Sequence, residues 1–565
     1  MYLDSEVLRS SPTKLIRAVG EYLKKLQIGE IMNRLVLILL LISTLKIQAQ
    51  QTENSNIYLM DFDYFIENLI ATHPDPFTAF GNEIGFYGEK QKIKEEIKKI
   101  STDDEFVFIL NKFVSRLEDG HTFINKSSKS KNSEVKNLPV SFKVASDKLF
   151  VQNTTKEYKS LIGKPVVSIN NIPIDSLLAK VKLYYPTENI SGSYFNLINI
   201  LKSNVSAQEF FDDNLNTLKL TFKGADSVQS VVISYVDTLN WLTQESSVTI
   251  PNQNGWINCS MIGKDKKIAY FQWNSMVSRE LLEHIVQENP KNIEGSLQWI
   301  YGGMLRDKRT GDVKKDINQI PAVYEQFYLM LQEMKVKGSK YLIIDLRNNN
   351  GGYTSLTEPL LYILFGEKYL NFDFNAEYIV KMSPLFLRKY GITIDQYNNS
   401  NNTDYMIGDY ISSDFGNIQG NSHAEKVEHV ENGYYGFGKD FVRKSINLNC
   451  KPQIVILTSI NTFSAAYHFT YFLKRIGNTK IIGVAPRQAG NSFMESTPFE
   501  LPNTKITGSI SNSVQILYKK DTETGKLLHP DFEMTWKEFS EYQFNKDAEV
   551  LKAIELIETE KINTR

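Results

Sequence analysis

Two runs of apolar residues, each ending in a polar turn, organise the C-terminal half of this chain. The first, KYLIIDLRNNNGG, covers residues 340–352, and the second, QIVILTSINTFSAAYHF, covers residues 453–469. Continuous apolar runs of this kind are typical of strands that are buried on both faces of a parallel sheet. The pattern therefore predicts strands at 341–344 and 454–457, with a polar turn at the carboxyl end of each.

Helical periodicity lies before the first of these strands and after the second. One apolar face that ends near Gly338 comprises Val323, Phe327, Met330, Leu331 and Met334. After the second strand, a turn reaches Ser464, a helix follows until Gly477, and residues 480–482 form another strand. Alternation of strand and helix is typical of β-α-β crossovers around a parallel sheet. We therefore expect an α/β domain of this crossover type over residues 266–540.

The segment before residue 137 has a helical pattern. Thr102 and Glu105 predict a capping box, and an apolar stripe at helical spacing follows, made of Phe106, Ile109, Leu110, Phe113, Val114 and Leu117. Gly120 is expected to end this helix, because glycine adopts the left-handed conformation after a helix end without strain. We predict an N-terminal helical domain over residues 57–136, with His121 on an ordered turn before a short strand.

Between residues 137 and 260 the pattern changes to short alternating runs, such as VSFKV, KLFVQ and VVISYV. Such alternation is typical of half-buried strands separated by turns. We predict a compact, mostly β domain, which either only packs or binds an extended peptide by strand addition. The last segment, residues 541–565, is predicted to form a C-terminal helix.

Residues 1–49 have the pattern of a leader with a signal peptide. From Met32 onward, Arg34 precedes an apolar run over residues 35–45, and the small residue Ala49 follows. This order is typical of a secretory signal, and the run is shorter than the roughly 20 apolar residues that span a membrane. We expect translation to start at Met32, cleavage after Ala49, export to the periplasm or beyond, and no stable membrane span.

The composition excludes several classes of function. The chain has 42% hydrophobic and 23% charged residues, as an ordinary folded protein has. A net charge of -1 provides no basic surface for a phosphate backbone, so nucleic acid is not an expected partner. The two cysteines, Cys259 and Cys450, are too few for a thiolate metal site, and whether they pair stays open. The sequence contains no GxSxG, Walker or HExxH motif.

Ser464 and the paired glycines of the first turn carry the candidate chemistry. Sites in open α/β sheets form at the carboxyl ends of the strands, where both turns are expected. Gly351 and Gly352 allow close approach to the main chain, and a serine at a helix start lies near amides that favour negative charge. Together these features predict a nucleophile with an oxyanion hole. Each also fits a structural role by itself, as a helix N-cap or a tight turn.

The pair DLRNNNGG and TFSAA, with DGHT upstream, resembles the tail-specific or C-terminal processing peptidases, and in particular their tricorn-like branch. The similarity extends over residues 57–529. It implies a crotonase-like crossover fold for the catalytic domain, a PDZ-like fold for the alternating strands, and a peptide or unfolded protein as substrate, with no metal or organic cofactor. The implied site residues are the nucleophile Ser464 and the oxyanion-hole amides of Ala465 and of Gly351 or Gly352.

The sequence offers two candidates for the general base. The Ser/Lys branch of the family has a lysine after the next strand, but here that position falls near Ala489, and no lysine lies between Lys480 and Lys505. The tricorn-like branch uses a histidine of the upstream motif, which corresponds to His121. A neutral imidazole accepts a serine proton near neutral pH. The alternative base is His468, one helical turn after the serine.

Two positions depart from the tricorn-like pattern. Gly120 stands where a serine precedes the histidine, and the nearest candidate for the orienting glutamate is Glu523. Such a group fixes the imidazole tautomer. Three interpretations follow: an exported serine peptidase in which His121 deprotonates Ser464, a catalytically silent secreted peptide-binding protein of the same fold, and a hydrolase of non-peptide esters. The oligomeric state is not determined by the sequence.

Overall fold

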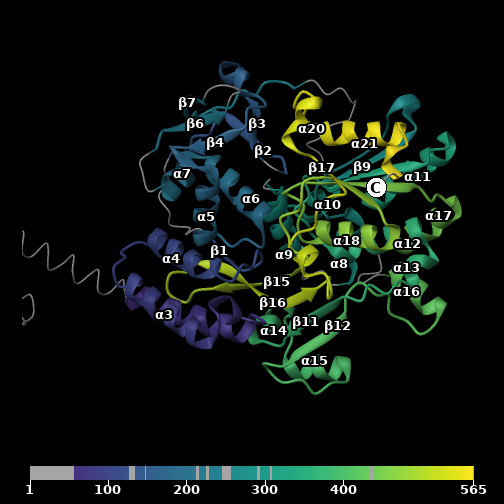
Figure 1. Cartoon of the computed structure of the whole chain (residues 1–565). Coiled ribbons are helices and arrows are strands. Elements are labelled where there is room, and N and C mark those ends of the chain that lie inside the picture. The colour runs from purple at the N-terminus through teal and green to yellow at the C-terminus, as the bar shows by residue number, and fades with distance from the viewer. Residues whose placement is uncertain are drawn as a thin grey trace, which may run out of the picture.

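The computed structural model describes residues 56–125, 134–146, 148–211, 215–223, 228–244, 256–288, 293–305, 308–432 and 438–563 (Figure 1). The expected leader and signal peptide, residues 1–49, lie outside the described residues. The described chain combines α-helices with two large sheets and two smaller ones. The fold is therefore mixed α and β, as predicted.

A six-stranded sheet with the order β17-β14-β13-β10-β9-β8 lies at the centre of the C-terminal half. Its strands are β8 (Ile257–Ile262), β9 (Ile268–Trp273), β10 (Tyr341–Asp345), β13 (Gln453–Thr458), β14 (Lys480–Gly483) and β17 (Phe532–Glu533). All neighbours are parallel except β8, which pairs antiparallel with β9. The two predicted strands are β10 and β13, which pair directly, with Leu342 opposite Ile454.

Helices cover both faces of this sheet. On one face, Ile344 and Ile456 pack with α11 (Val323–Lys337), α12 (Glu358–Phe365) and α18 (Ala465–Gly477). On the other face, Ile343 and Val455 pack with the C-terminal helices α20 (Trp536–Glu541) and α21 (Ala548–Glu558). The apolar face of α11 is buried and Gly338 ends it in the left-handed conformation, as predicted. The last helix thus completes the layer around the central sheet.

A second, antiparallel sheet joins the N-terminal part of the chain to the C-terminal half. It contains β1 (Phe123–Ile124), β11 (Glu377–Lys381), β12 (Tyr410–Asp414), β15 (Asn491–Glu500) and β16 (Thr507–Ile516). Phe123 pairs with Ser509 and Ile124 with Gly508. A Cβ on Gly508 would lie 2.4 Å from the carbonyl oxygen of Phe123, so glycine permits this approach. This pairing fixes the turn that precedes β1 against the β15–β16 hairpin.

The N-terminal helices lie beside that hairpin (Figure 1). They are a helix over residues 56–72, α3 (Glu83–Ile97) and α4 (Asp103–Ser115). The capping box of Thr102 and Glu105 is present and the apolar stripe is buried, as predicted. The prediction that Gly120 ends the helix is wrong, because α4 ends at Ser115 and the left-handed residue is Glu118, with φ 52°.

The region after residue 134 contains more helix than the alternating pattern predicts. Its strands are β2 (Val140–Val144), β3 (Leu149–Thr154), β4 (Val166–Ile169), β5 (Ile172–Pro173), β6 (Thr217–Lys223) and β7 (Val228–Ser234). Three helices lie between β5 and β6, namely α5 (Ile174–Tyr184), α6 (Ile190–Leu201) and α7 (Asn204–Phe211). The prediction of a mostly β domain is therefore wrong, because helices make up as much of this region as strands do. The sequence pattern did not reveal α6, since its isoleucines and aromatic residues are also frequent in strands. The boundary at residue 260 is also wrong, because β8 belongs to the central sheet.

Neither a disulfide nor a membrane-spanning helix is present in the described ranges. Cys259 on β8 and Cys450 before β13 are both free thiols. None of the described helices is long and apolar enough to cross a membrane.

Candidate active site

Ser464 lies in the turn between β13 and α18, at the carboxyl edge of the central sheet. Its backbone has φ 52° and ψ -126°, a strained conformation for a residue with a side chain. Its amide donates a hydrogen bond to Oε1 of Gln488. The side chain makes no helix-capping bond, and no described residue forms a hydrogen bond with its Oγ. The helix N-cap explanation of Ser464 therefore does not apply, and a partly exposed hydroxyl is left available.

The two polar turns predicted from the sequence are in direct contact and are joined by hydrogen bonds. Three hydrogen bonds join them: Ser459 Oγ to the carbonyl oxygen of Arg347 (2.5 Å), Thr462 Oγ1 to that of Leu346 (2.9 Å), and the Phe463 amide to that of Asn349 (3.1 Å). A Cβ placed on Gly351 would lie 2.6 Å from the Cβ of Ser464. The glycine turn is therefore in contact with the serine turn.

The amides around Ser464 differ in their availability. The Gly351 amide donates to Oδ1 of Asn349 at 2.7 Å. The amides of Gly352 and Ala465 have no hydrogen-bond acceptor within the described part of the chain. Gly352 has φ 141°, and a Cβ there would lie 2.2 Å from the carbonyl oxygen of Met276, so only glycine fits. Two amides of these turns thus remain able to donate to a negatively charged oxygen.

His121 lies against the serine turn although the two are far apart in sequence. Its ring stacks on the ring of Phe463, with centroids 4.7 Å apart and an interplanar angle of 19°. The side chain is 9% exposed, and neither ring nitrogen has a hydrogen-bond partner. Thr122, the next residue, accepts a hydrogen bond from the Ser511 amide at 2.9 Å. The pairing of β1 with β16 therefore brings an available imidazole next to the residue that precedes Ser464.

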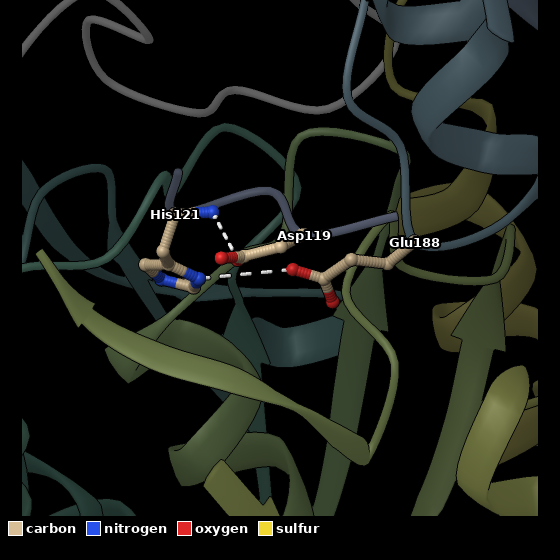
Figure 2. A group of neighbouring side chains, drawn as sticks. All are labelled: Asp119, His121 and Glu188. Carbon is tan, nitrogen blue, oxygen red and sulfur yellow. Dashed lines mark hydrogen bonds and ion pairs between the residues drawn. The ribbon is translucent and has the colours of Figure 1, made fainter. Parts of the chain in front are cut away.

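Glu188 is the carboxylate beside this imidazole. Its Oε1 lies 3.7 Å from Nδ1 of His121, as Figure 2 shows. Glu188 also accepts hydrogen bonds from the Gly120 amide (3.2 Å) and the Ala489 amide (2.8 Å). Burial disfavours the charged imidazole, but the Glu188 carboxylate outweighs this effect and raises the pKa of His121 above its ordinary value. Because Nδ1 faces Glu188, Nε2 is the nitrogen left to accept a proton.

Gly120 lies where Glu188 and Phe463 pack against the main chain, and not at a helix end as predicted. A Cβ at this position would lie 2.7 Å from Oε1 of Glu188 and 3.1 Å from the ring of Phe463. The residue therefore lacks a side chain because the carboxylate and the aromatic ring pack directly against its main chain.

Asp119 orders the turn that carries His121. One of its oxygens accepts from the His121 amide at 2.8 Å, and the other accepts from the Thr122 hydroxyl at 2.5 Å and lies 3.4 Å from Nε2 of His73. The Asp119 and His73 side chains are both 0% exposed. Burial alone would raise the pKa of Asp119, but His73 and these hydrogen bonds lower it to about 2. No motif surrounds His73, so sequence patterns do not indicate its contact with Asp119.

The same residues raise the question of a metal site. Asp119, His121 and Glu188 place potential ligand atoms within 4.8 Å of one another. The Asp119 carboxylate, however, is directed to the main-chain amide of His121 and not to its ring (Figure 2). Hydrogen bonds and ion pairs within the chain account for this cluster, and its geometry requires no metal.

His468, the alternative base, is held by packing. Its Nδ1 lies 2.9 Å from Oγ1 of Thr354, and its Nε2 lies 2.7 Å from Oε1 of Gln515. Burial lowers the pKa of His468 to about 4. Both ring nitrogens therefore have a partner, which leaves neither to accept a proton from Ser464.

Glu523 lies away from this cluster. It belongs to the short helix α19 (Thr522–Lys526), its side chain is 84% exposed, and it pairs with Lys526 at 3.1 Å. The prediction that Glu523 orients the base is therefore wrong, because the carboxylate beside the imidazole is that of Glu188. Glu188 was missed because it lies in the connection between α5 and α6, in a stretch without a recognisable motif.

The comparison with protein families is consistent with this geometry. Residues 315–534 match Peptidase family S41. The chain therefore contains a family S41 peptidase region, and it is a serine-type peptidase. The matched residues contain both polar turns and Ser464, whereas His121 and Glu188 precede them. Among curated proteins, no sequence matches this S41 peptidase.

Solved structures extend the likeness to most of the S41 peptidase. Mature CPAF complexed with lactacystin is 14% identical, with a TM-score of 0.53, and the match covers 90% of this chain and 99% of that one. Mature CPAF by itself is also 14% identical, with a TM-score of 0.53, over 88% and 98% of the two chains. At this identity the likeness shows a shared fold.

Proposed function

We propose that this S41 peptidase is an exported endopeptidase or carboxyl-end processing peptidase with Ser464 as nucleophile and His121 as general base. The observation that carries the proposal is the position of the His121 ring. It stacks on Phe463, next to Ser464, and its Nε2 has no hydrogen-bond partner, whereas both ring nitrogens of His468 are engaged. A base must lie near the proton that it removes, and catalytic hydrogen bonds are often incomplete without substrate.

The proposed reaction uses the groups of the site in sequence. Nε2 of His121 takes the hydroxyl proton of Ser464 while Oγ forms a bond to the peptide carbonyl carbon, and Glu188 stabilises the imidazolium. The oxyanion accepts hydrogen bonds from the amides of Gly352 and Ala465. The imidazolium then protonates the leaving amine, and the same imidazole activates a water molecule that hydrolyses the acyl-enzyme.

The same fold could also serve a catalytically silent peptide-binding protein or a hydrolase of non-peptide esters. The geometry of the site argues against the first, and an experiment separates the second. A silent peptide-binding protein has no need for an available serine hydroxyl near an imidazole whose Nε2 is free of hydrogen bonds and whose pKa is raised by a buried carboxylate. A hydrolase of non-peptide esters would share the nucleophile, and substrate profiling separates it from a peptidase.

Labelling with a fluorophosphonate tests the mechanism. We expect the mature wild-type protein to be labelled, and Ser464→Ala and His121→Ala to lose labelling. Glu188→Gln should be labelled more slowly, and the matched variant Glu523→Gln should react like wild type because its carboxylate is exposed. Absence of labelling in wild type would support the silent protein. Products of a peptide library, analysed by mass spectrometry, separate peptide from ester hydrolysis.

The domain before the central sheet is proposed to bind the substrate chain, as the PDZ-like resemblance implies. A cavity of about 470 Å³ lies between β2, α6 and the loop after β10. Within the described sheets β2 pairs only with β3, so its other edge can receive an extended peptide by strand addition. Ile198 of α6 lines this cavity, whereas Ile190 of the same helix is 43% exposed.

Filling the cavity tests this binding role. Ile198→Trp should raise KM for long peptides about tenfold, equivalent to about 1.4 kcal/mol, with kcat unchanged. Ile190→Trp adds the same side chain outside the cavity and should leave KM unchanged. Equal effects of the two variants would contradict peptide binding at this place.

Export is proposed from the signal pattern of residues 32–49. Mass spectrometry of the mature protein should find Gln50 as its first residue. A mature chain that retains residues 1–49 would contradict cleavage and export by this route.

A further inference from the structure

A second cavity, of about 370 Å³, lies directly beside the catalytic cluster. Gly120, Glu188 and Phe463, which surround the His121 ring, form part of its wall. The rest of the wall includes the aromatic residues Phe108, Phe123, Tyr184, Tyr185 and Phe195. The cavity is large enough for a substrate side chain or the end of a peptide, and it adjoins the residues proposed to act on the peptide bond.

Arg487 provides a positive charge in the wall of this cavity. Its guanidinium lies between two aromatic rings, 3.9 Å from the ring centroid of Phe195 and 4.2 Å from that of Phe463. Nη1 donates to the carbonyl oxygens of Ile460 (3.2 Å) and Asn461 (2.9 Å). The rings and carbonyls fix the plane of the guanidinium, so its remaining donors have a defined direction.

Those remaining donors, Nε and Nη2 of Arg487, have no acceptor within the described part of the chain. No carboxylate of the described residues lies within ion-pair distance of Arg487. Burial lowers the pKa of Arg487 to about 9, so the group remains cationic at neutral pH. An unpaired cation is costly to bury, and the cost is offset when an anion binds.

The charge of Glu188 favours the cationic form of Arg487, but no described acidic residue forms an ion pair with it. The Glu188 carboxylate already binds two main-chain amides and faces His121. Asp104 and Glu209 line the cavity but are exposed to solvent. Their negative charges disfavour a multiply charged anion such as phosphate. A single carboxylate, in contrast, matches the two parallel donors that a guanidinium presents through Nε and Nη2.

We propose that Arg487 binds a carboxylate of the peptide substrate in this cavity, next to the scissile bond. The inference rests on the proposed function, since it takes a peptide as the substrate. The carboxylate is supplied either by an aspartate or glutamate side chain or by a free carboxyl terminus. Arg487 is then a specificity-determining residue that selects which peptide bond lies against Ser464.

Matched peptide pairs test the proposal. In the first pair, one peptide has glutamate and the other has glutamine at a position next to the cleaved bond, and each flanking position is tested in turn. In the second pair, one peptide ends in a free carboxyl group and the other in an amide. Wild type should have a kcat/KM about 10- to 100-fold higher for the carboxylate member of one pair, as for a hydrogen bond to a charged group. The pair that responds identifies the source of the carboxylate. Arg487→Met should reduce the ratio to about one, and Arg487→Lys should retain part of it because the charge remains.

Arg475→Met is the matched control. This arginine contacts the ring of Tyr471 at 5.9 Å and does not line the cavity. It should retain the wild-type ratio. Circular dichroism and thermal unfolding of each variant separate altered recognition from loss of fold.

Equilibrium binding of the same peptides to full-length Ser464→Ala makes this result independent of catalysis. If wild type is not labelled by a fluorophosphonate, the proposed function fails, but the binding preference for the carboxylate member still tests Arg487. Equal binding and equal cleavage of both members of both pairs would overturn the inference. A preference that persists unchanged in folded Arg487→Met would also overturn it.

Discussion

Replacing Gly351 with alanine tests how the glycine turn holds the nucleophile. Gly351 has φ 104°, a conformation that costs a residue with a side chain about 1 to 3 kcal/mol. The added Cβ would lie 2.6 Å from the Cβ of Ser464 and 2.9 Å from the carbonyl oxygen of Phe463. Carbon atoms in contact are normally about 3.5 to 4.0 Å apart. Relief of this overlap therefore requires the two turns to separate by about 1 Å.

Such a displacement should affect activity more than stability. A misplacement of about 1 Å at a reacting group lowers the rate about 100-fold, which corresponds to about 2.7 kcal/mol of transition-state stabilisation. We expect Gly351→Ala to lower kcat/KM and the rate of fluorophosphonate labelling by at least this factor. Thermal unfolding, measured in parallel, shows whether the chain remains folded.

Gly338→Ala is the control for backbone strain. Gly338 also has a positive φ, 62°, but no atom lies within 4 Å of a Cβ placed there. The substitution should cost about 1 to 2 kcal/mol of stability and leave labelling unchanged. If Gly351→Ala is labelled as fast as Gly338→Ala, a side chain at position 351 does not displace Ser464. That result would refute the argument that close packing of the glycine turn positions the nucleophile.

Two further predictions concern the charges around the base. Glu188→Gln should move the acidic limb of kcat/KM to lower pH, because His121 acts in its deprotonated form and the carboxylate raises its pKa; a limb that stays in place would contradict the pairing. Asp119 has a lowered pKa, so its contribution to stability is present above its ordinary pKa of 3.8 and is lost as the pH falls through about 2. At about 1.4 kcal/mol per pH unit, this lowering of the Asp119 pKa corresponds to about 2 kcal/mol of stability. Chemical denaturation should therefore find Asp119→Asn less stable than wild type at pH 7, with the gap narrowing toward pH 3, and a constant gap would argue against the shifted pKa.

Some predictions failed because local pattern and tertiary packing disagree. The helices α6 and α7 were not foreseen, since their isoleucine and phenylalanine residues occur as readily in strands. The end of α4 was placed at Gly120 because glycine commonly ends helices. In the structure, Gly120 is instead the place where Glu188 and Phe463 pack against the main chain. What a glycine does depends on which atoms approach it, and these come from distant segments.

The sequence by itself determined the serine side of the site. The strands β10 and β13 follow from unbroken apolar runs, and α11 and its end at Gly338 follow from helical periodicity and a glycine. Ser464 and the glycine pair Gly351 and Gly352 lie in short segments directly after these strands. Their mutual contact follows from one rule, that the carboxyl ends of adjacent parallel strands meet at the same edge.

The tertiary structure alone decided what surrounds His121. Its position depends on β1 pairing with β16, and its raised pKa depends on Glu188, which no local pattern connects with it. The same holds for the contact between His73 and Asp119, and for the exposure of Glu523. Periodicity reports which face of an element is buried, and a motif reports local chemistry. Neither reports which strand edges meet or which carboxylate shares a buried space with an imidazole, because those outcomes are set by the packing of the whole chain.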